Sequence, residues 1–206
     1  MRARKMLFLG LVLLFVPMVQ NCGTSGGGGG VGSGDAVVAE KLITEGWSNI
    51  SVGNLETARG NFVQALEGPL TDDQRIRANS GMAWSLSRND KINEAIPYFE
   101  IASQKDNEAK VGLAAALIYR HQSTEDYKRA AELLGNMPVE KFTPVHAGIG
   151  LTAAKAHALT AIAYALSGEP TLAKTYINKA AALDSQMVGT TVDKVDEAFQ
   201  LLGWKD

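Results

Sequence analysis

The sequence predicts an all-α protein made of helical repeats, and three observations lead to that prediction. From Ala39 onward, apolar residues recur at helical spacing in a chain rich in Ala, Leu, Glu and Lys. No segment of that part alternates apolar and polar residues in the way that predicts a β-strand. One pattern of small and apolar residues also returns four times. We therefore expect one helical domain over residues 37–206, with about four helix–turn–helix units and a C-terminal capping helix.

The charge balance argues against a nucleic-acid partner. The chain has 20 Lys and Arg residues against 22 Asp and Glu, a formal net charge of −2. Three of the basic residues, Arg2, Arg4 and Lys5, lie in the first 22 positions, so the rest of the chain is more acidic still. Proteins that bind nucleic acid usually present a basic face. We expect no such face here.

The first residues have the organisation of a secretory signal. A basic start is followed by an apolar run of 14 residues from Met6 to Val19. A membrane-spanning helix needs about 20 apolar residues, and Pro17 interrupts the run. The sequence therefore predicts a signal peptide over residues 1–21. An uncleaved N-terminal anchor is the alternative.

Cys22 is the only cysteine in the chain and stands at the end of the apolar run. The residues Val19-Gln20-Asn21-Cys22 resemble the lipobox of bacterial lipoproteins, although that family prefers a smaller residue than Asn21 before the cysteine. The resemblance implies cleavage before Cys22 and lipidation of its sulfur. Because Gly23 rather than Asp follows, it also implies a place in the cell envelope, at the outer membrane facing the periplasm. An inert thiol is the alternative.

Residues 22–36 are predicted to be a flexible tether between the lipid and the helical domain. The stretch from Gly23 to Gly34 reads GTSGGGGGVGSG. A Gly-rich coil of this length spans about 20 Å. Its glycines formally match a dinucleotide fingerprint, but no strand precedes them and such a run matches almost automatically. We expect the tether to hold the domain away from the membrane surface.

Four segments between residues 39 and 187 share one pattern. A small or apolar residue stands 12 positions before an alanine, a turn signal stands five before it, and apolar residues follow it at four and seven. The sets are Gly46, Gly53, Ala58, Phe62 and Ala65; Ala83, Asp90, Ala95, Phe99 and Ala102; Ile118, Glu125, Ala130, Leu134 and Met137; and Ala161, Gly168, Ala173, Ile177 and Ala180. The units are expected near 39–72, 76–109, 111–144 and 154–187.

These four sets resemble the tetratricopeptide repeat (TPR), a 34-residue helix–turn–helix unit. The resemblance implies a right-handed α-solenoid, in which small residues let paired helices approach and one large apolar residue fills the space between units. One unit cannot bury its apolar face alone, so about three or more must stack. The resemblance also implies protein–protein interaction through the concave groove.

Local signals place the ends of the helices. Gly53 and Gly168 predict turns, Pro170 predicts the first turn of a helix, and Thr71 with Gln74 predicts a capping box. The extra length before the fourth unit falls at residues 143–153, where Thr143-Pro144 predicts a cap and first-turn proline. We expect it to lengthen the first helix of that unit. Residues 191–204 predict an amphipathic capping helix.

No catalytic constellation stands out from the sequence. The three histidines, His121, His146 and His157, form no metal-binding pair at i, i+4, and no nucleophile-elbow motif is present. The spacing Gly148-x-Gly150-x-x-Ala153 loosely fits a dinucleotide motif but follows no predicted strand. We expect no enzyme activity, metal, cofactor or small-molecule substrate.

The candidate binding residues occupy the ninth position of each unit's first helix. They are Trp47, Trp84, Tyr119 and Ile162. In the TPR family this position lines the concave groove, so the resemblance implies a ladder that binds a peptide or partner helix. The alternative is a ladder packed in the core, as most aromatic stripes at helical spacing are. Arg77 and Arg88, expected beside the ladder, could bind an acidic peptide or a terminal carboxylate, or could simply be solvated.

Taken together, these features predict a membrane-anchored adapter or scaffold for protein–protein interaction in the bacterial cell envelope. The alternative is a constitutive structural subunit of an outer-membrane assembly, secretion or pilus complex, such as a pilotin-like or barrel-assembly-like accessory lipoprotein. Fold alone does not decide between them.

Overall fold

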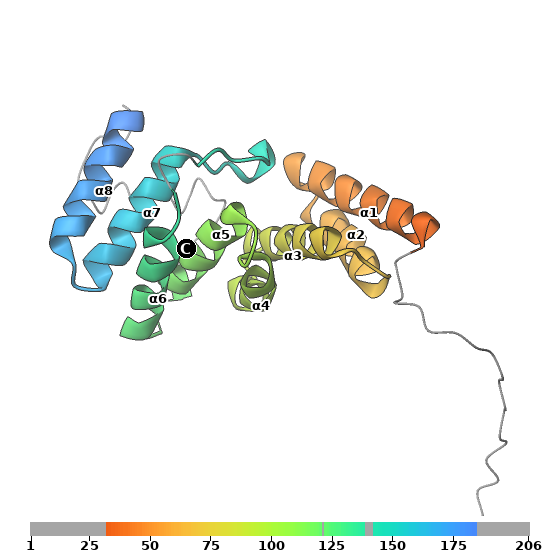
Figure 1. Cartoon of the computed structure of the whole chain (residues 1–206), viewed down its shortest axis with the longest axis horizontal. Helices are drawn as coiled ribbons and strands as arrows, with labels where there is room; N and C mark the ends of the chain where they lie inside the picture. The colour runs from red at the N-terminus through yellow and green to blue at the C-terminus, as the bar shows by residue number, and fades with distance from the viewer. Residues whose placement is uncertain (1–31, 121, 139–141, 185–206) are drawn as a thin grey trace, which may run out of the picture. The chain divides into compact units, whose positions relative to one another are not determined.

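The computed structural model describes residues 32–120, 122–138 and 142–184. Within these ranges the chain forms eight α-helices and one short 3-10 helix and has no strand, which confirms the all-α prediction (Figure 1). The helices are α1 (Ser33–Ser51), α2 (Leu55–Glu67), α3 (Asp72–Ser87), α4 (Ile92–Ala102), α5 (Asn107–Arg120), α6 (Thr124–Gly135), η2 (Ala147–Ile149), α7 (Ala153–Leu166) and α8 (Pro170–Leu183). Four predicted parts lie outside the described residues: the signal peptide, Cys22, residues 23–31 of the glycine run and the cap at 191–204.

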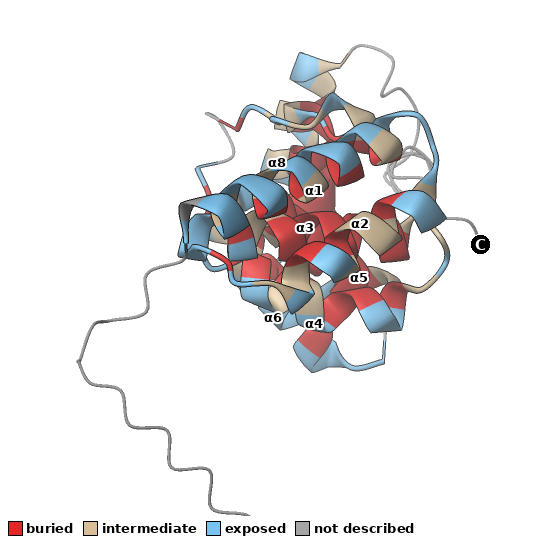
Figure 2. Ribbon diagram, turned by 90° about the vertical axis from the view of Figure 1, so that its right-hand side faces the viewer, coloured by how far each residue is buried: buried red, intermediate tan, exposed pale blue. Residues whose placement is uncertain are grey.

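The helices pair as four consecutive hairpins: α1 with α2, α3 with α4, α5 with α6, and α7 with α8. Each hairpin packs on the next, and the first helices are also neighbours, since α1 contacts α3, α3 contacts α5 and α5 contacts α7. The buried residues face inward between them (Figure 2). Consecutive packing of this kind is what a helical repeat requires.

Most of the small and apolar residues of the repeat pattern lie in the core. Phe62 is fully buried, and its ring fills the space between α1 and α3. A Cβ atom added at Gly46 would lie 2.6 Å from this ring, and one added at Gly81 would lie 2.1 Å from it. Phe99 occupies the same place one hairpin later, against Gly112 of α5. Glycine is needed at these positions because the rings leave no room for a side chain.

Most of the predicted turns and caps are present, with exceptions at Glu125 and at Thr143-Pro144. Gly53 and Gly168 have positive φ angles of 80° and 91°, which glycine adopts without strain. Thr71 and Gln74 form the predicted capping box. In the third unit the predicted turn residue, Glu125, lies instead in the first turn of α6, because Ser123 caps that helix by accepting a hydrogen bond from the Asp126 N–H.

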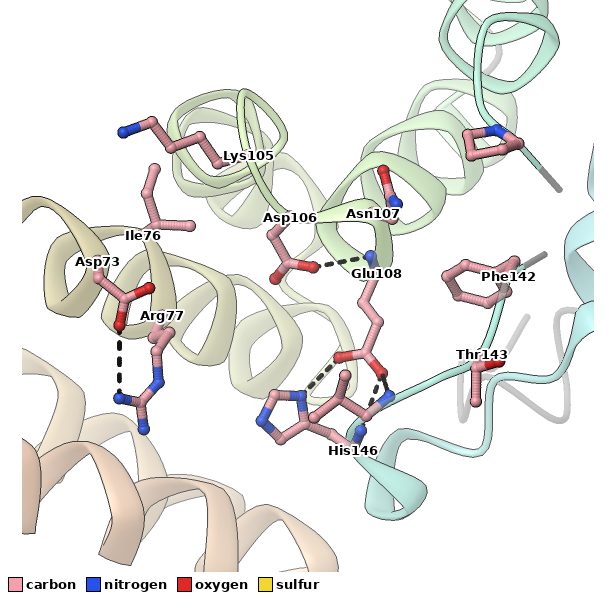
Figure 3. Close-up of a pocket in the computed structure, with 12 residues that line it drawn as sticks. Asp73, Ile76, Arg77, Lys105, Asp106, Asn107, Glu108, Phe142, Thr143 and His146 are labelled. Atoms are coloured by element: carbon pink, nitrogen blue, oxygen red, sulfur yellow. Dashed lines mark hydrogen bonds and ion pairs between the residues drawn. The ribbon is translucent and has the colours of Figure 1, made fainter.

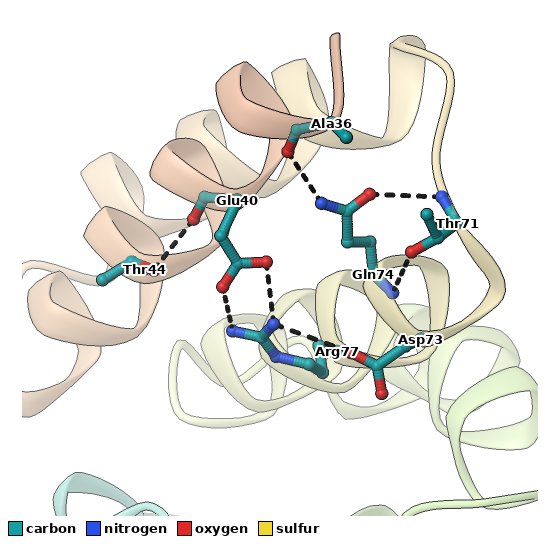
Figure 4. Close-up of polar contacts among 7 residues, drawn as sticks. All are labelled: Ala36, Glu40, Thr44, Thr71, Asp73, Gln74 and Arg77. Atoms are coloured by element: carbon teal, nitrogen blue, oxygen red, sulfur yellow. Dashed lines mark hydrogen bonds and ion pairs between the residues drawn. The ribbon is translucent and has the colours of Figure 1, made fainter. Parts of the chain in front are cut away.

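The first helix begins earlier than predicted. Residues 33–36, expected in the tether, belong to α1. Asp35 lies in the first turn, where its negative charge interacts favourably with the helix dipole. The Ala36 carbonyl accepts a hydrogen bond of 2.8 Å from Gln74 Nε2, which ties this end of α1 to α3 (Figure 4).

The predicted lengthening of the fourth unit's first helix is wrong. Helix α7 begins at Ala153, and its cap is Thr152, whose side chain accepts from the Lys155 N–H. Residues 142–150, called the strap below, contain only the short η2, and Gly150 has a φ of 69° that interrupts regular helix. The strap runs back toward α1, where η2 packs against that helix (Figure 1).

Candidate functional site

Three of the four ladder residues lie in the core. Trp84 and Ile162 are buried, and Trp47 is 8% exposed, whereas Tyr119 is half-buried. Trp84 packs edge-on against Phe99 with ring centroids 5.2 Å apart. In this structure the Trp84 ring is therefore not accessible to a partner, as the core alternative for the ladder expects. The reason is that the ring packs inside the second hairpin, against a side chain of α4.

Trp47 differs from Trp84 because one face of its ring is covered by the strap. The His146 imidazole stacks on the Trp47 indole with centroids 3.6 Å apart and planes 11° apart. The edge of the same indole meets Phe62 from the core side. Trp47 therefore contacts the core of the first hairpin on one side and the strap on the other.

Glu108, in the first turn of α5, holds the centre of the strap (Figure 3). Its Oε1 accepts hydrogen bonds from two consecutive backbone N–H groups, those of Val145 at 2.5 Å and His146 at 2.9 Å. Its Oε2 lies 2.5 Å from Nδ1 of His146, which donates because an ionised carboxylate can only accept. Burial raises the pKa of Glu108, but the hydrogen bonds from His146 and Val145 outweigh burial, so the net pKa is lowered from 4.5.

Arg88 and Gly148 attach the strap to the C-terminal end of α1. The Arg88 guanidinium donates to the Gly148 carbonyl at 2.7 Å and to the Ile50 carbonyl at 3.4 Å. Burial lowers the pKa of Arg88, although a guanidinium stays charged. Gly148 lies so close to α1 that a Cβ atom on it would be 2.6 Å from Cα of Ser51. Only glycine fits this contact.

Arg77, which was predicted to lie beside the ladder, forms ion pairs with two carboxylates of the protein itself. Its guanidinium binds both carboxylate oxygens of Glu40, at 2.8 and 2.9 Å, and lies 3.7 Å from Asp73 (Figure 4). The hydrogen bond from Arg77 lowers the pKa of Glu40 and raises the pKa of Arg77 itself. Arg77 thus links α1 to α3, and Arg88 links α3 to the strap, so the structure does not bring the two guanidinium groups to one ligand.

A cavity of about 610 Å³ lies beside the strap (Figure 3). Its walls come from the start of α3, the start of α5 with the preceding turn, and the segment before η2. The lining residues are Asp73, Ile76, Arg77, Lys105, Asp106, Asn107, Glu108, Pro138, Phe142, Thr143, Val145 and His146. The volume is in the range of ligand pockets, and the lining mixes charged with apolar side chains.

Asp106, directly before α5, is one of the residues that line this cavity. It accepts a hydrogen bond from the Glu108 N–H at 2.8 Å and another from Ser80 Oγ at 2.5 Å. Burial raises the pKa of Asp106, which the Ser80 hydrogen bond opposes and the nearby Glu108 charge reinforces. The pKa shifts of these two carboxylates are opposite, because burial dominates at Asp106 and the Glu108 charge adds to it, whereas at Glu108 the bonds from the strap outweigh burial.

Sequence reasoning missed Glu108, Ser51 and the role of Gly148. The available signal was the long insertion itself, in which Pro144, Gly148 and Gly150 disfavour a continuous helix. The close approach of Gly148 to Ser51 explains why position 148 is glycine.

The described residues hold no group of three or more His, Cys, Asp and Glu side chains suited to a metal ion. In the same part of the chain, no helix combines the length and the apolar character needed to cross a bilayer. Comparisons of the chain with protein-family models, with curated protein sequences and with solved structures give no match. Function is therefore inferred from the geometry of the strap and its surroundings.

Proposed function

We propose that this protein is an adapter for protein–protein interaction, which binds an extended segment of a partner on the surface formed by α1, α3 and α5. The observation that supports the proposal is the strap itself. It is an irregular segment held by contacts to its backbone, and a peptide offers the same backbone groups. The adjoining cavity provides open space next to those contacts. A right-handed, TPR-like solenoid would present this surface on its concave side.

We further propose that the adapter is anchored in the bacterial cell envelope through a lipid on Cys22. The support is the lipobox-like sequence ending at Cys22 and the glycine run after it. Two or more acyl chains give stable anchoring where a single chain is marginal. Mass spectrometry of the mature N-terminus should find an acylated Cys22. The Cys22→Ser variant should lose the acyl mass and leave the membrane fraction. An unmodified, uncleaved N-terminus in the wild-type protein would contradict the anchor.

Site-specific photo-crosslinking in living cells tests the adapter proposal. A photoreactive residue placed at Asp73 or Thr143, both on the cavity, should capture the same protein. The matched control is Lys128, which is exposed on α6 and away from the cavity. Capture from Lys128 or from α8 but not from the cavity would reject the proposal and favour the alternative of a constitutive subunit.

A further inference from the structure

The strap is bound by groups that recognise a polypeptide in general. Glu108 accepts two consecutive backbone N–H groups, and Arg88 donates to a backbone carbonyl two residues later. Glu108 lies on α5 and Arg88 caps the end of α3, so both groups are distant in sequence from the strap. Such contacts do not require the bound segment to belong to the same chain.

Three side-chain features of the strap add sequence preference. His146 supplies a flat ring that stacks on Trp47. Gly148 supplies a position without a Cβ atom against Ser51. Ile149 supplies an aliphatic side chain that is 1% exposed. A buried aliphatic anchor surrounded by directional polar contacts is the usual arrangement at the centre of a binding interface.

The middle of the strap contributes little to the core. Val145 is 81% exposed and Ala147 is exposed, so between Phe142 and Ile149 the segment is held mainly by hydrogen bonds and one ring stack. A typical hydrogen bond has a net value of about 0.5–1.5 kcal/mol. An incoming segment that makes the same contacts and also fills the place of Ile149 can therefore replace this part without unfolding the helices.

We propose that the surface of Trp47, Ser51, Arg88 and Glu108 binds a partner segment with the chemistry of the strap, and that the strap occupies this site in cis until the partner displaces it. The partner segment carries a flat ring, a glycine two residues later and an aliphatic residue immediately after that glycine. This inference rests on the proposed adapter function and names the segment that the adapter recognises.

A labelled peptide with the sequence of residues 142–150, added to the full chain in detergent, tests the inference by fluorescence anisotropy. In the wild-type protein the strap competes at an effective concentration on the order of millimolar, so the peptide should bind weakly. Gly148→Ala should release the strap, because its Cβ atom would collide with the backbone of Ser51. The peptide should then bind at least about tenfold more tightly, since the competent fraction rises.

Matched variants separate the site from general effects. Gly60→Ala, a glycine of α2 with open space around it, should bind the peptide as the wild type does. Adding Glu108→Gln to Gly148→Ala should remove the gain, because the acceptor of the two N–H groups loses its charge. A peptide with alanine in place of its glycine should not bind to any variant.

Peptide binding by Gly148→Ala that is no tighter than by the wild type would overturn the inference. If circular dichroism shows that Gly148→Ala has lost helix, His146→Ala takes its place, because it removes the ring stack and the Nδ1 hydrogen bond without a steric clash. The same tenfold gain is expected, and its absence would be equally decisive. Capture from the cavity in cells without peptide binding would overturn only this inference, whereas peptide binding without capture would overturn the adapter proposal.

Discussion

The helical hairpins and the strap are held in different ways. In the first two hairpins, Phe62 and Phe99 are fully buried and fill spaces beside glycines of the neighbouring helices. The middle of the strap buries little and is attached by hydrogen bonds from its backbone to Glu108 and Arg88. Burial of a large apolar side chain contributes about 1.5–3 kcal/mol, more than a single hydrogen bond does. The hairpins therefore depend on apolar burial, and the middle of the strap, between the buried Phe142 and Ile149, is the separable part.

The largest effect is expected for Trp84→Ala. As an accessible groove residue Trp84 would tolerate this change, but its full burial predicts a loss of about 3–5 kcal/mol in unfolding free energy. Urea denaturation followed by circular dichroism measures it. Trp84→Phe is the control and should cost much less, because the indole N–H has no hydrogen-bond partner among the described residues. Unchanged stability of Trp84→Ala would contradict its place in the core.

An intermediate effect is expected for Glu108→Gln. The change removes the charge from a carboxylate that accepts three hydrogen bonds, and bonds to charged groups contribute about 1.5–3 kcal/mol. Hydrogen exchange should accelerate at the amides of Val145 and His146 and stay slow in α3 and α4. Glu94→Gln is the matched control, since Glu94 is an exposed residue in the first turn of α4. Equal acceleration throughout the helices would show that strap and hairpins form one unit.

Acid should weaken the attachment of the strap. The pKa of Glu108 is lowered in the folded protein, so its contribution to stability is present above the ordinary value of 4.5 and is lost as the pH falls through the lowered value. The difference in urea midpoint between the wild type and Glu108→Gln should therefore shrink between neutral pH and about pH 3. A difference that grows toward low pH would mean that the sign of the shift is wrong.

The smallest effect is expected for Glu40→Gln, which weakens the pair between α1 and α3. The Glu40 and Arg77 side chains are 45% and 35% exposed, and pairs of this kind contribute about 0.2–1 kcal/mol. A shift of the thermal midpoint that decreases with added salt is the expected result. A loss as large as that of Trp84→Ala would contradict the dominance of apolar packing in the hairpins.

The helical part of the fold was predictable because its signals are local. The capping box at Thr71, the turn glycines Gly53 and Gly168, and the first-turn Pro170 each act within a few residues. The repeat spacing then showed which positions are buried. Two helix starts were predicted less accurately: α1 already begins at Ser33, and Ser123 rather than Glu125 marks the start of α6.

The candidate site was less predictable because it depends on residues far apart in sequence. Thr143-Pro144 carries the local signal of a helix start, yet the N–H groups of Val145 and His146 bind Glu108 from another hairpin. No spacing in the sequence indicates that Gly148 meets Ser51. The ladder was hard to assign for another reason: the same periodic pattern is expected whether the residues line a groove or pack in the core.

The sequence by itself determined that the chain forms paired helices with small residues at close approaches, because propensity, capping and periodic burial are written in neighbouring residues. Only the tertiary structure decided that Trp84 is enclosed, that Trp47 is covered by His146, and that residues 142–150 lie across α1, α3 and α5. The physical reason is that a side chain's environment depends on which helices stack beside it, and hydrogen-bond partners for irregular backbone are chosen in space.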